Sequence, residues 1–263
     1  MSPLQTDGLV PRFVRQGLGS AEIEGVWLEP PDADGPVLLY FHGGGFCFAS
    51  LRTHGNLIGA LARAARARTL AMDYRLAPEH PVPAALEDAL MAYRHLLAQQ
   101  IPATRIVLAG DSAGGTLVLQ TLLALRDAGE PMPAAGVALS PWVDLGCSGA
   151  SFQANAAFDF VGEEHCRLAA ANYLAGADSG RPDISPHFAQ LQGLPPLLVH
   201  AGEAEVLVDQ IRSFVERAQA AGVDVRFSLY PDMVHVWQMM RSATPDAQRA
   251  IDEVGAFVRI HAR

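Results

Sequence analysis

Two short strings in the chain hold residue types that suit acyl transfer. The first, Gly110-Asp111-Ser112-Ala113-Gly114, has the form G-x-S-x-G and lies between an apolar run and a helical pattern. A serine at such a strand-to-helix turn has an exposed hydroxyl, so Ser112 is a candidate nucleophile, with the amide of Ala113 directed at the substrate oxygen. Taken alone, the string could also be a glycine-rich turn without chemistry.

The second string, His42-Gly43-Gly44-Gly45-Phe46, directly follows another apolar run. Three consecutive glycines cost conformational entropy, so a fold that keeps them generally uses their φ freedom or lets another group approach the backbone. An oxyanion hole has this need, because backbone N–H groups must face a developing negative oxygen. A flexible turn is the alternative for this string alone. The two strings together favour a serine hydrolase.

The elements that must position these strings alternate as strand and helix along the chain. Continuous apolar runs predict buried strands, and apolar residues three and four apart predict amphipathic helices. Strands are expected at 22–28, 37–42, 69–74, 105–111, 136–142, 196–202 and 223–231, and helices at 53–67, 83–99, 112–129, 207–222 and 245–262. Such consecutive units imply one α/β domain over residues 1–263, with a mostly parallel central sheet flanked by helices.

One segment interrupts this alternation. Residues 145–195 contain no strand pattern, although 162–176 looks helical, and the segment is too long for a plain connection. We expect it to form a cap over the site. The roughly twenty residues before the 22–28 strand, 1–20, are the second expected cap element, and their shortness predicts a reduced helical cap.

With both strings in view, the chain resembles the hormone-sensitive-lipase-like (bacterial family IV) carboxylesterases of the α/β-hydrolase superfamily, which carry HGGG and GDSAG. The likeness extends over nearly the whole chain. It includes Asp-Tyr-Arg-Leu-Ala-Pro-Glu-His-Pro at 73–81, Ser-Pro-Trp-Val-Asp at 140–144 and the segment 202–209. The resemblance implies an α/β-hydrolase fold and an ester-hydrolysing enzyme.

The base must come from one of nine histidines, after the serine and the acid in chain order. His235 matches the family's catalytic histidine by order, by motif and by its place after the last predicted strand. The other histidines have less specific interpretations. His42 and His80 resemble structural residues of the family; His54, His95, His165 and His261 fall on predicted helices as surface or interface residues; His187 lies in the cap segment; and His200 ends a strand as a satisfied buried residue.

Three carboxylates compete for the role of the acid: Glu203, Glu205 and Asp209. The family pattern resembles D-P-L-x-D, and aligning its leucine with Leu207 places the acid at Glu205. This chain departs from the pattern twice, because glutamate replaces aspartate and Val206 replaces proline. Glu203 is otherwise interpreted as a solvated loop carboxylate, and Asp209 as a carboxylate near a helix N-terminus, where the dipole favours it.

The resemblance implies two-step acyl transfer with Ser112, Glu205 and His235 as the triad, acting on a small-molecule ester. The amides of Gly44, Gly45 and Ala113 are the expected oxyanion hole, and Gly43 shapes the loop. No metal or other cofactor is implied. Asp111 could steady the segment 76–81 or close the turn, and Cys47 receives no catalytic role.

Other reactions and one other class of protein remain open. The same residues could cleave an amide, a formamide or a lactone, and kynurenine formamidases share the HGGG layout. The gibberellin receptor resembles the family yet only binds its ligand, having lost the base that this chain keeps.

A reduced cap provides less apolar wall for a long acyl chain, and each buried methylene contributes about 0.8 kcal/mol. We therefore expect short-chain esters as substrates.

Composition limits the partners and the compartment. Half of the residues are hydrophobic and 18% are charged, as in folded proteins, and 19 basic against 28 acidic residues give a net charge of −9. That charge argues against a nucleic-acid partner. Three cysteines suit a reducing cytoplasm, and neither a secretory leader nor a membrane span is apparent. We expect a cytoplasmic protein, and the resemblance suggests a homodimer.

Overall fold

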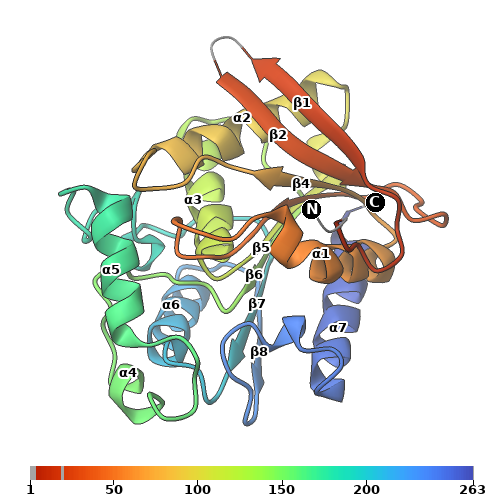
Figure 1. Cartoon of the computed structure of the whole chain (residues 1–263). Coiled ribbons are helices and arrows are strands. Elements are labelled where there is room, and N and C mark those ends of the chain that lie inside the picture. Colours follow the sequence, from red (N-terminus) through yellow and green to blue (C-terminus); the bar gives the residue numbers. More distant parts are fainter. Residues whose placement is uncertain (1–3, 19–20, 263) are drawn as a thin grey trace.

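The computed structural model describes residues 4–18 and 21–262, and its centre is one eight-stranded sheet (Figure 1). The spatial order of the strands is β1-β2-β4-β3-β5-β6-β7-β8. Their bounds are β1 Arg12–Leu18, β2 Ala21–Leu28, β3 Val37–Phe41, β4 Arg68–Asp73, β5 Ile106–Asp111, β6 Ala135–Leu139, β7 Leu197–Gly202 and β8 Val225–Tyr230. The pairs β1–β2 and β2–β4 are antiparallel, and all pairs from β4 to β8 are parallel. The α/β fold with a mostly parallel sheet is confirmed.

The parallel strands are continuous apolar runs because both faces of the sheet are covered. In β5, Ile106 and Leu108 belong to the core on one face, whereas Val107 and Ala109 belong to the core on the other. A strand buried on both sides keeps apolar residues at every position rather than at alternate ones. This packing fixes the carboxyl ends of β5, β7 and β8, where the candidate residues lie.

Five long helices form the two outer layers. On one face lie α1 (Leu51–Ala65) and α7 (Pro245–His261), which pack against each other, and on the other lie α2 (Ala84–Ala98), α3 (Ala113–Asp127) and α6 (Val208–Ala220). The helix expected from Thr53 begins two residues earlier. Ser50 is its N-cap and forms a reciprocal capping box with Thr53, which satisfies amides that the first turn leaves free.

The cap segment 145–195 is free of strands, as predicted. It contains α4 (Ser151–Ala154), α5 (Glu163–Leu174) and a 3-10 turn, η2 (Pro186–Phe188). Buried side chains of α5 join the same core as α3, so the segment is packed onto the domain rather than tethered to it. Two further 3-10 turns, η1 (Ala103–Arg105) and η3 (Trp237–Met239), complete the elements of the described residues.

The N-terminal segment differs from the expected cap element. Residues 12–18 form β1, which pairs antiparallel with β2 at the edge of the sheet. Upstream of it, the backbone at Gln5 and Thr6 packs against Gly55 and Gly59 of α1. Within the described part of 1–20, this segment therefore extends and supports the sheet. No helix among the described residues has the length and apolarity to cross a membrane.

Candidate active site

Ser112 lies at the sharp turn where β5 ends and α3 begins. Its backbone has φ 52° and ψ −121°, in a region that residues with a side chain rarely adopt. The turn is held by the Ser112 amide, which donates to the Leu139 carbonyl oxygen at 2.8 Å. A Cβ at Gly114 would overlap the carbonyl oxygen of Phe41, so this position needs glycine. The local sequence thus dictates the turn that lifts the hydroxyl from the sheet.

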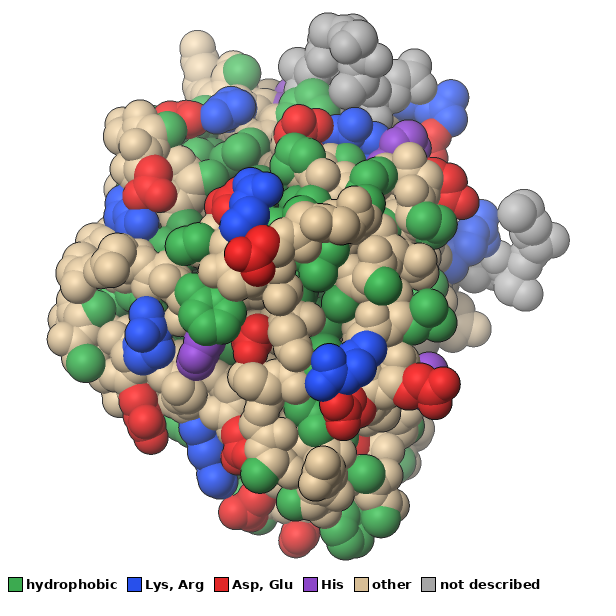
Figure 2. All heavy atoms as spheres, turned by 90° about the vertical axis from the view of Figure 1, so that its left-hand side faces the viewer, with side chains coloured by type: hydrophobic (Ala, Val, Ile, Leu, Met, Phe, Trp, Pro, Cys, Tyr) green, Lys and Arg blue, Asp and Glu red, His purple; other side chains and the backbone are tan. Residues whose placement is uncertain are grey.

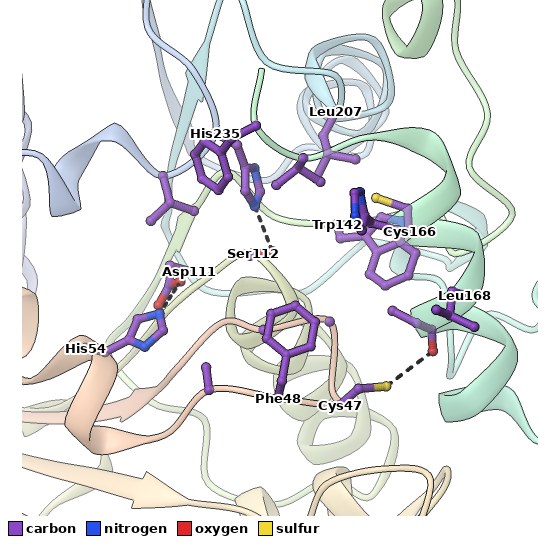
Figure 3. Close-up of a pocket in the computed structure, with 18 of the residues that line it drawn as sticks. Cys47, Phe48, His54, Asp111, Ser112, Trp142, Cys166, Leu168, Leu207 and His235 are labelled. Carbon is purple, nitrogen blue, oxygen red and sulfur yellow. Dashed lines mark hydrogen bonds and ion pairs between the residues drawn. The ribbon is translucent and has the colours of Figure 1, made fainter. Parts of the chain in front are cut away.

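His235 follows β8, and its imidazole faces the serine (Figure 3). Its Nε2 lies 2.8 Å from Ser112 Oγ, within hydrogen-bond distance. On the other side of the ring, Nδ1 lies 3.7 Å from Oε2 of Glu205, which is ion-pair rather than hydrogen-bond distance. Glu205 comes from the loop after β7 and is fully buried, and His235 is 4% exposed. The structure thus brings Ser112, His235 and Glu205 together, with the imidazole between the other two side chains.

Burial and charge act in opposite directions on the buried base. Burial alone would lower the pKa of His235, but the carboxylates of Glu205, Asp159 and Asp111, with Glu205 contributing most, together raise it above its ordinary value. Burial raises the pKa of Glu205, and the neighbouring imidazole only partly offsets this rise. A proton accepted at Nε2 would be stabilised by the carboxylate behind it, as general base catalysis requires.

The other two acid candidates lie elsewhere. Glu203 is exposed and its carboxylate is 3.8 Å from the Arg212 guanidinium. Asp209 is in the first turn of α6 and accepts a hydrogen bond from the Ser151 amide at 2.8 Å. Of the three carboxylates considered, Glu205 is the one placed against His235.

The glycine loop after β3 lies beside the serine. Gly44 and Gly45 have positive φ angles of 114° and 59°, and both line the same pocket as Ser112. The Gly44 carbonyl turns away to accept from the amides of Cys47 and Phe48, both at 3.0 Å. Ala113 is the first residue of α3, so its amide is one of those that a helix does not bond internally. Gly44 and Gly45 thus lie at the same pocket as Ser112, and Ala113 directly follows the serine.

Asp111, next to the serine, binds the glycine loop through its carboxylate. One carboxylate oxygen accepts from the Tyr40 hydroxyl and, at 3.1 Å, from the Gly43 amide; the other lies 3.1 Å from Nε2 of His54. These contacts match neither of the two roles considered for Asp111, because they bind β3, the glycine loop and α1. The segment 76–81 is bound to the glycine loop separately, because the Ala77 amide donates to the Phe46 carbonyl at 2.8 Å.

His54 is not the surface or interface residue expected from its helix. It is 5% exposed, its Nε2 faces Asp111, and its Nδ1 lies 2.8 Å from the Thr53 hydroxyl. Burial would lower its pKa, but the charge and hydrogen bond of Asp111, together with the Ser50 backbone and Asp73, outweigh burial, and the net pKa is raised. Burial would raise the pKa of Asp111, but His54, the Tyr40 hydroxyl and His42 together lower it below its ordinary value. The two groups form a buried ion pair one residue from the nucleophile.

The remaining histidines have separate places. His42 stacks on Tyr74 and its Nδ1 donates to the Gly43 carbonyl at 2.7 Å, which supports the structural role expected of it. His200 is fully buried as expected, and its Nε2 lies 3.2 Å from Oε2 of Glu253, at ion-pair distance but without hydrogen-bond geometry. His80 is exposed, and His165 lines the pocket from α5.

Ser112 and His235 line one pocket of about 380 Å³ together with Gly44 and Gly45. Its walls are mainly apolar, and the side chains that enclose it include Phe48, Trp142, Phe160, Leu168, Leu207 and Met239. On the α5 side, Figure 2 shows hydrophobic side chains at the surface among charged ones. Among the described residues, no group of three or more His, Cys, Asp or Glu side chains is close enough to hold a metal ion.

Comparison with known proteins agrees with this geometry. Residues 38–239 match the model of a family described as alpha/beta hydrolase fold. The chain is 47% identical to an acetyl-hydrolase of Streptomyces hygroscopicus, covering 89% of this chain and 78% of that protein. It is 36% identical to an esterase of Acinetobacter venetianus, over 84% of this chain and 74% of that one. This chain belongs to the alpha/beta hydrolase fold family.

Solved structures indicate to which branch of the family this chain belongs. An esterase of the bacterial hormone-sensitive lipase family is 46% identical, with a TM-score of 0.93, and the match covers 100% of this chain and 87% of that one. The esterase EstE5, in a crystal soaked with p-nitrophenyl butyrate, is 41% identical over 95% of this chain and 85% of that one, with a TM-score of 0.90. The resemblance predicted from the two motifs is confirmed, and the chain is an enzyme of this esterase branch.

The sequence patterns did not indicate two polar residues near this hydrolase site, His54 and Asp159. His54 could have been found, because Leu51, Ile58 and Leu61 mark the buried face of its helix and His54 lies on that face. Asp159, in the cap, accepts from the His235 amide at 3.3 Å. Nothing in its surrounding sequence signals this contact.

Proposed function

We propose that this protein is a serine carboxylesterase that hydrolyses short-chain acyl esters through an acyl-enzyme at Ser112. The observation that carries the proposal is the 2.8 Å contact between Ser112 Oγ and His235 Nε2 at an apolar pocket, with the buried Glu205 behind the ring. The family membership supports the same conclusion.

In the first half-reaction, Ser112 Oγ attacks the ester carbonyl carbon while His235 Nε2 takes the hydroxyl proton. Glu205 orients the imidazole and stabilises its positive charge. The amides of Gly44, Gly45 and Ala113 donate to the negative oxygen of the tetrahedral intermediate. The proton then passes to the alcohol as its bond to carbon breaks.

In the second half-reaction, water attacks the acyl-enzyme. His235 takes a proton from the water, and the new tetrahedral intermediate collapses with Ser112 as the leaving group. The proton returns to Oγ and the carboxylic acid departs. Every proton transfer passes through one nitrogen, Nε2, so no cofactor is needed.

The size of the pocket supports a preference for short acyl groups. About 380 Å³ is near the lower end of the range for small-molecule sites. A longer chain gains about 0.8 kcal/mol for each methylene that stays buried, and this gain ends where the chain leaves the pocket. We therefore expect kcat/KM to peak roughly between acetate and hexanoate.

A panel of p-nitrophenyl esters of increasing acyl length tests the proposal, with anilide, formamide and lactone analogues beside it. Ser112→Ala is the control, and a phosphonate probe should label Ser112 stoichiometrically in the wild type alone. A maximum at decanoate or longer would point to a lipase-like channel. Faster turnover of the amide or lactone would reassign the substrate class, and ligand binding without labelling would indicate a receptor.

A further inference from the structure

Asp159 lies in the cap, in the connection between α4 and α5, yet both of its carboxylate oxygens reach the loops that carry the acid and the base. Oδ2 accepts from the Val206 amide at 2.8 Å, and Oδ1 accepts from the His235 amide at 3.3 Å. Val206 directly follows Glu205. One side chain therefore binds the backbone beside two members of the candidate triad.

The same cap segment binds the other side of the acid's peptide bond. The side-chain amide of Asn155 donates to the carbonyl oxygens of Glu205 at 2.9 Å and Glu203 at 3.1 Å. The peptide that joins Glu205 to Val206 thus has its carbonyl held by Asn155 and its N–H held by Asp159. Two opposed contacts on one peptide fix its plane, and that plane sets the direction in which the Glu205 side chain leaves the backbone.

The acid and base loops also bond directly, because the Ala204 amide donates to the Met233 carbonyl at 3.0 Å. That contact secures the start of the acid loop. Asp159 binds farther along both loops, at Val206 and at His235 itself. The direct bond therefore joins the loops at the start of the acid loop, whereas Asp159 binds beside Glu205 and at His235.

Resting on the proposed function, we propose that Asp159 is a positioning residue of the triad, which clamps the Glu205–Val206 peptide and the His235 backbone from the cap and places a negative charge beside the base. Oε2 of Glu205 and Nδ1 of His235 are 3.7 Å apart, which is too far for a short hydrogen bond. Without a short hydrogen bond between acid and base, the orientation of the imidazole depends on the other groups that hold the two loops.

The charge of Asp159 has an effect distinct from its bonds. Four groups face His235: Ser112 at Nε2, Glu205 at Nδ1, Asp159 at the amide, and Asp111 across the turn. After Glu205, Asp159 is the next contributor to the raised pKa of His235. Because the base must be neutral to accept the serine proton, removing this charge moves the acid limb of the activity profile to lower pH.

Three variants separate the clamp from the charge. Asp159→Asn keeps the shape and one carbonyl acceptor but removes the charge and the second acceptor. Asp159→Glu keeps the charge on a longer side chain. Asp178→Asn is the matched control, because Asp178 is an exposed carboxylate near the end of the cap helix whose Oδ1 accepts from the nearby Gly180 amide.

The measurements are kcat and KM for p-nitrophenyl butyrate from pH 5 to 9, and the NMR titration of the His235 ring. For Asp159→Asn we expect kcat to fall roughly 10- to 100-fold, the cost of a misaligned group, with KM nearly unchanged. The acid limb and the ring titration should both shift to lower pH. Asp159→Glu should restore the position of the limb, and Asp178→Asn should behave as the wild type.

A folding defect is recognised by melting temperature, and the NMR titration is then read on the folded fraction. If Asp159→Asn keeps both the wild-type kcat and the wild-type ring titration, the proposal is overturned. It is also overturned if the Asn and Glu variants lose kcat equally with no shift of either titration, because the side chain is then only a spacer. If the wild type fails to hydrolyse esters while the ring titration still shifts in Asp159→Asn, the esterase assignment fails and the positioning role stands.

Discussion

Replacing His54 with glutamine should destabilise the protein more than any comparable change at an exposed histidine. His54 Nε2 lies 3.1 Å from Oδ2 of Asp111, and the two side chains are 7% and 2% exposed. Removing one partner of a buried ion pair costs about 3–5 kcal/mol, because the other charge is left buried without compensation. Here the Tyr40 hydroxyl and the Gly43 amide still donate to Asp111, so we expect the lower end, about 3 kcal/mol.

The expected loss of stability depends on pH, and the direction of this dependence follows from the pKa shifts of His54 and Asp111. The raised pKa of His54 means that its contribution is fully present below its unfolded value of about 6.5 and is lost as pH rises through the folded pKa. The lowered pKa of Asp111 gives a contribution that is present above about pH 3.9 and is lost as pH falls through its folded pKa. The difference between wild type and His54→Gln should therefore be largest between about pH 4 and 6.5 and should shrink at alkaline pH.

Thermal melting followed by circular dichroism tests this. At pH 6 a loss of about 3 kcal/mol corresponds to a fall in Tm of roughly 6–12 °C for a chain of this size. His80→Gln is the control, because His80 is exposed, and its Tm should stay within about 1 °C of the wild type. A fall of less than about 2 °C in His54→Gln that is constant from pH 5 to 9 would refute the buried ion pair.

Three further outcomes are expected. Glu205→Gln should lower kcat by about 10⁴ with the fold intact, because the imidazole loses its orienting charge, whereas exposed Glu203→Gln should change kcat little; a reversed ranking in steady-state assays would reassign the acid. Gly114→Ala should abolish soluble expression or cost at least about 3 kcal/mol in urea unfolding, because the new Cβ overlaps a backbone carbonyl; unchanged stability would contradict the tight turn. Glu253→Gln should cost about 2–3 kcal/mol at pH 7. Burial would raise the pKa of Glu253, but His200 and the hydroxyls of Ser228 and Tyr230 together lower it to about 2. This contribution is present above about pH 4.5 and is lost as pH falls toward 2, so wild type and variant should converge there.

The sheet and the main site residues were predictable because their signals are local. The continuous apolar run before Ser112, the glycines around it and the helical pattern after it occupy neighbouring positions, so the strand, turn and helix can be assigned together. His235 follows a recognisable strand, and parallel strands bring their carboxyl ends to one edge of a sheet. For these residues the chain order and the fold class already imply proximity.

The misses share a different property, which is dependence on a distant partner. His54 is on a predictable buried helix face, but its role as an ion-pair partner depends on Asp111, 57 positions later. Residues 12–18 form a strand because β2 offers an antiparallel partner, whereas their own sequence contains no strong strand pattern. The role of Asp159 depends on amides in two loops, 47 and 76 positions away. Such contacts are set by tertiary packing, which single-sequence patterns do not encode.

The two departures from the D-P-L-x-D pattern, at Glu205 and Val206, are connected once the fold is known. A proline at the second position would have no N–H, so it could not donate to a carboxylate in the cap. Val206 has one, and Asp159 accepts it at 2.8 Å. Glu205 has a side chain one methylene longer than aspartate, and its Oε2 lies 3.7 Å from Nδ1 of His235. The replacement of proline supplies the amide by which the cap holds that backbone, and the two substitutions therefore act on one peptide.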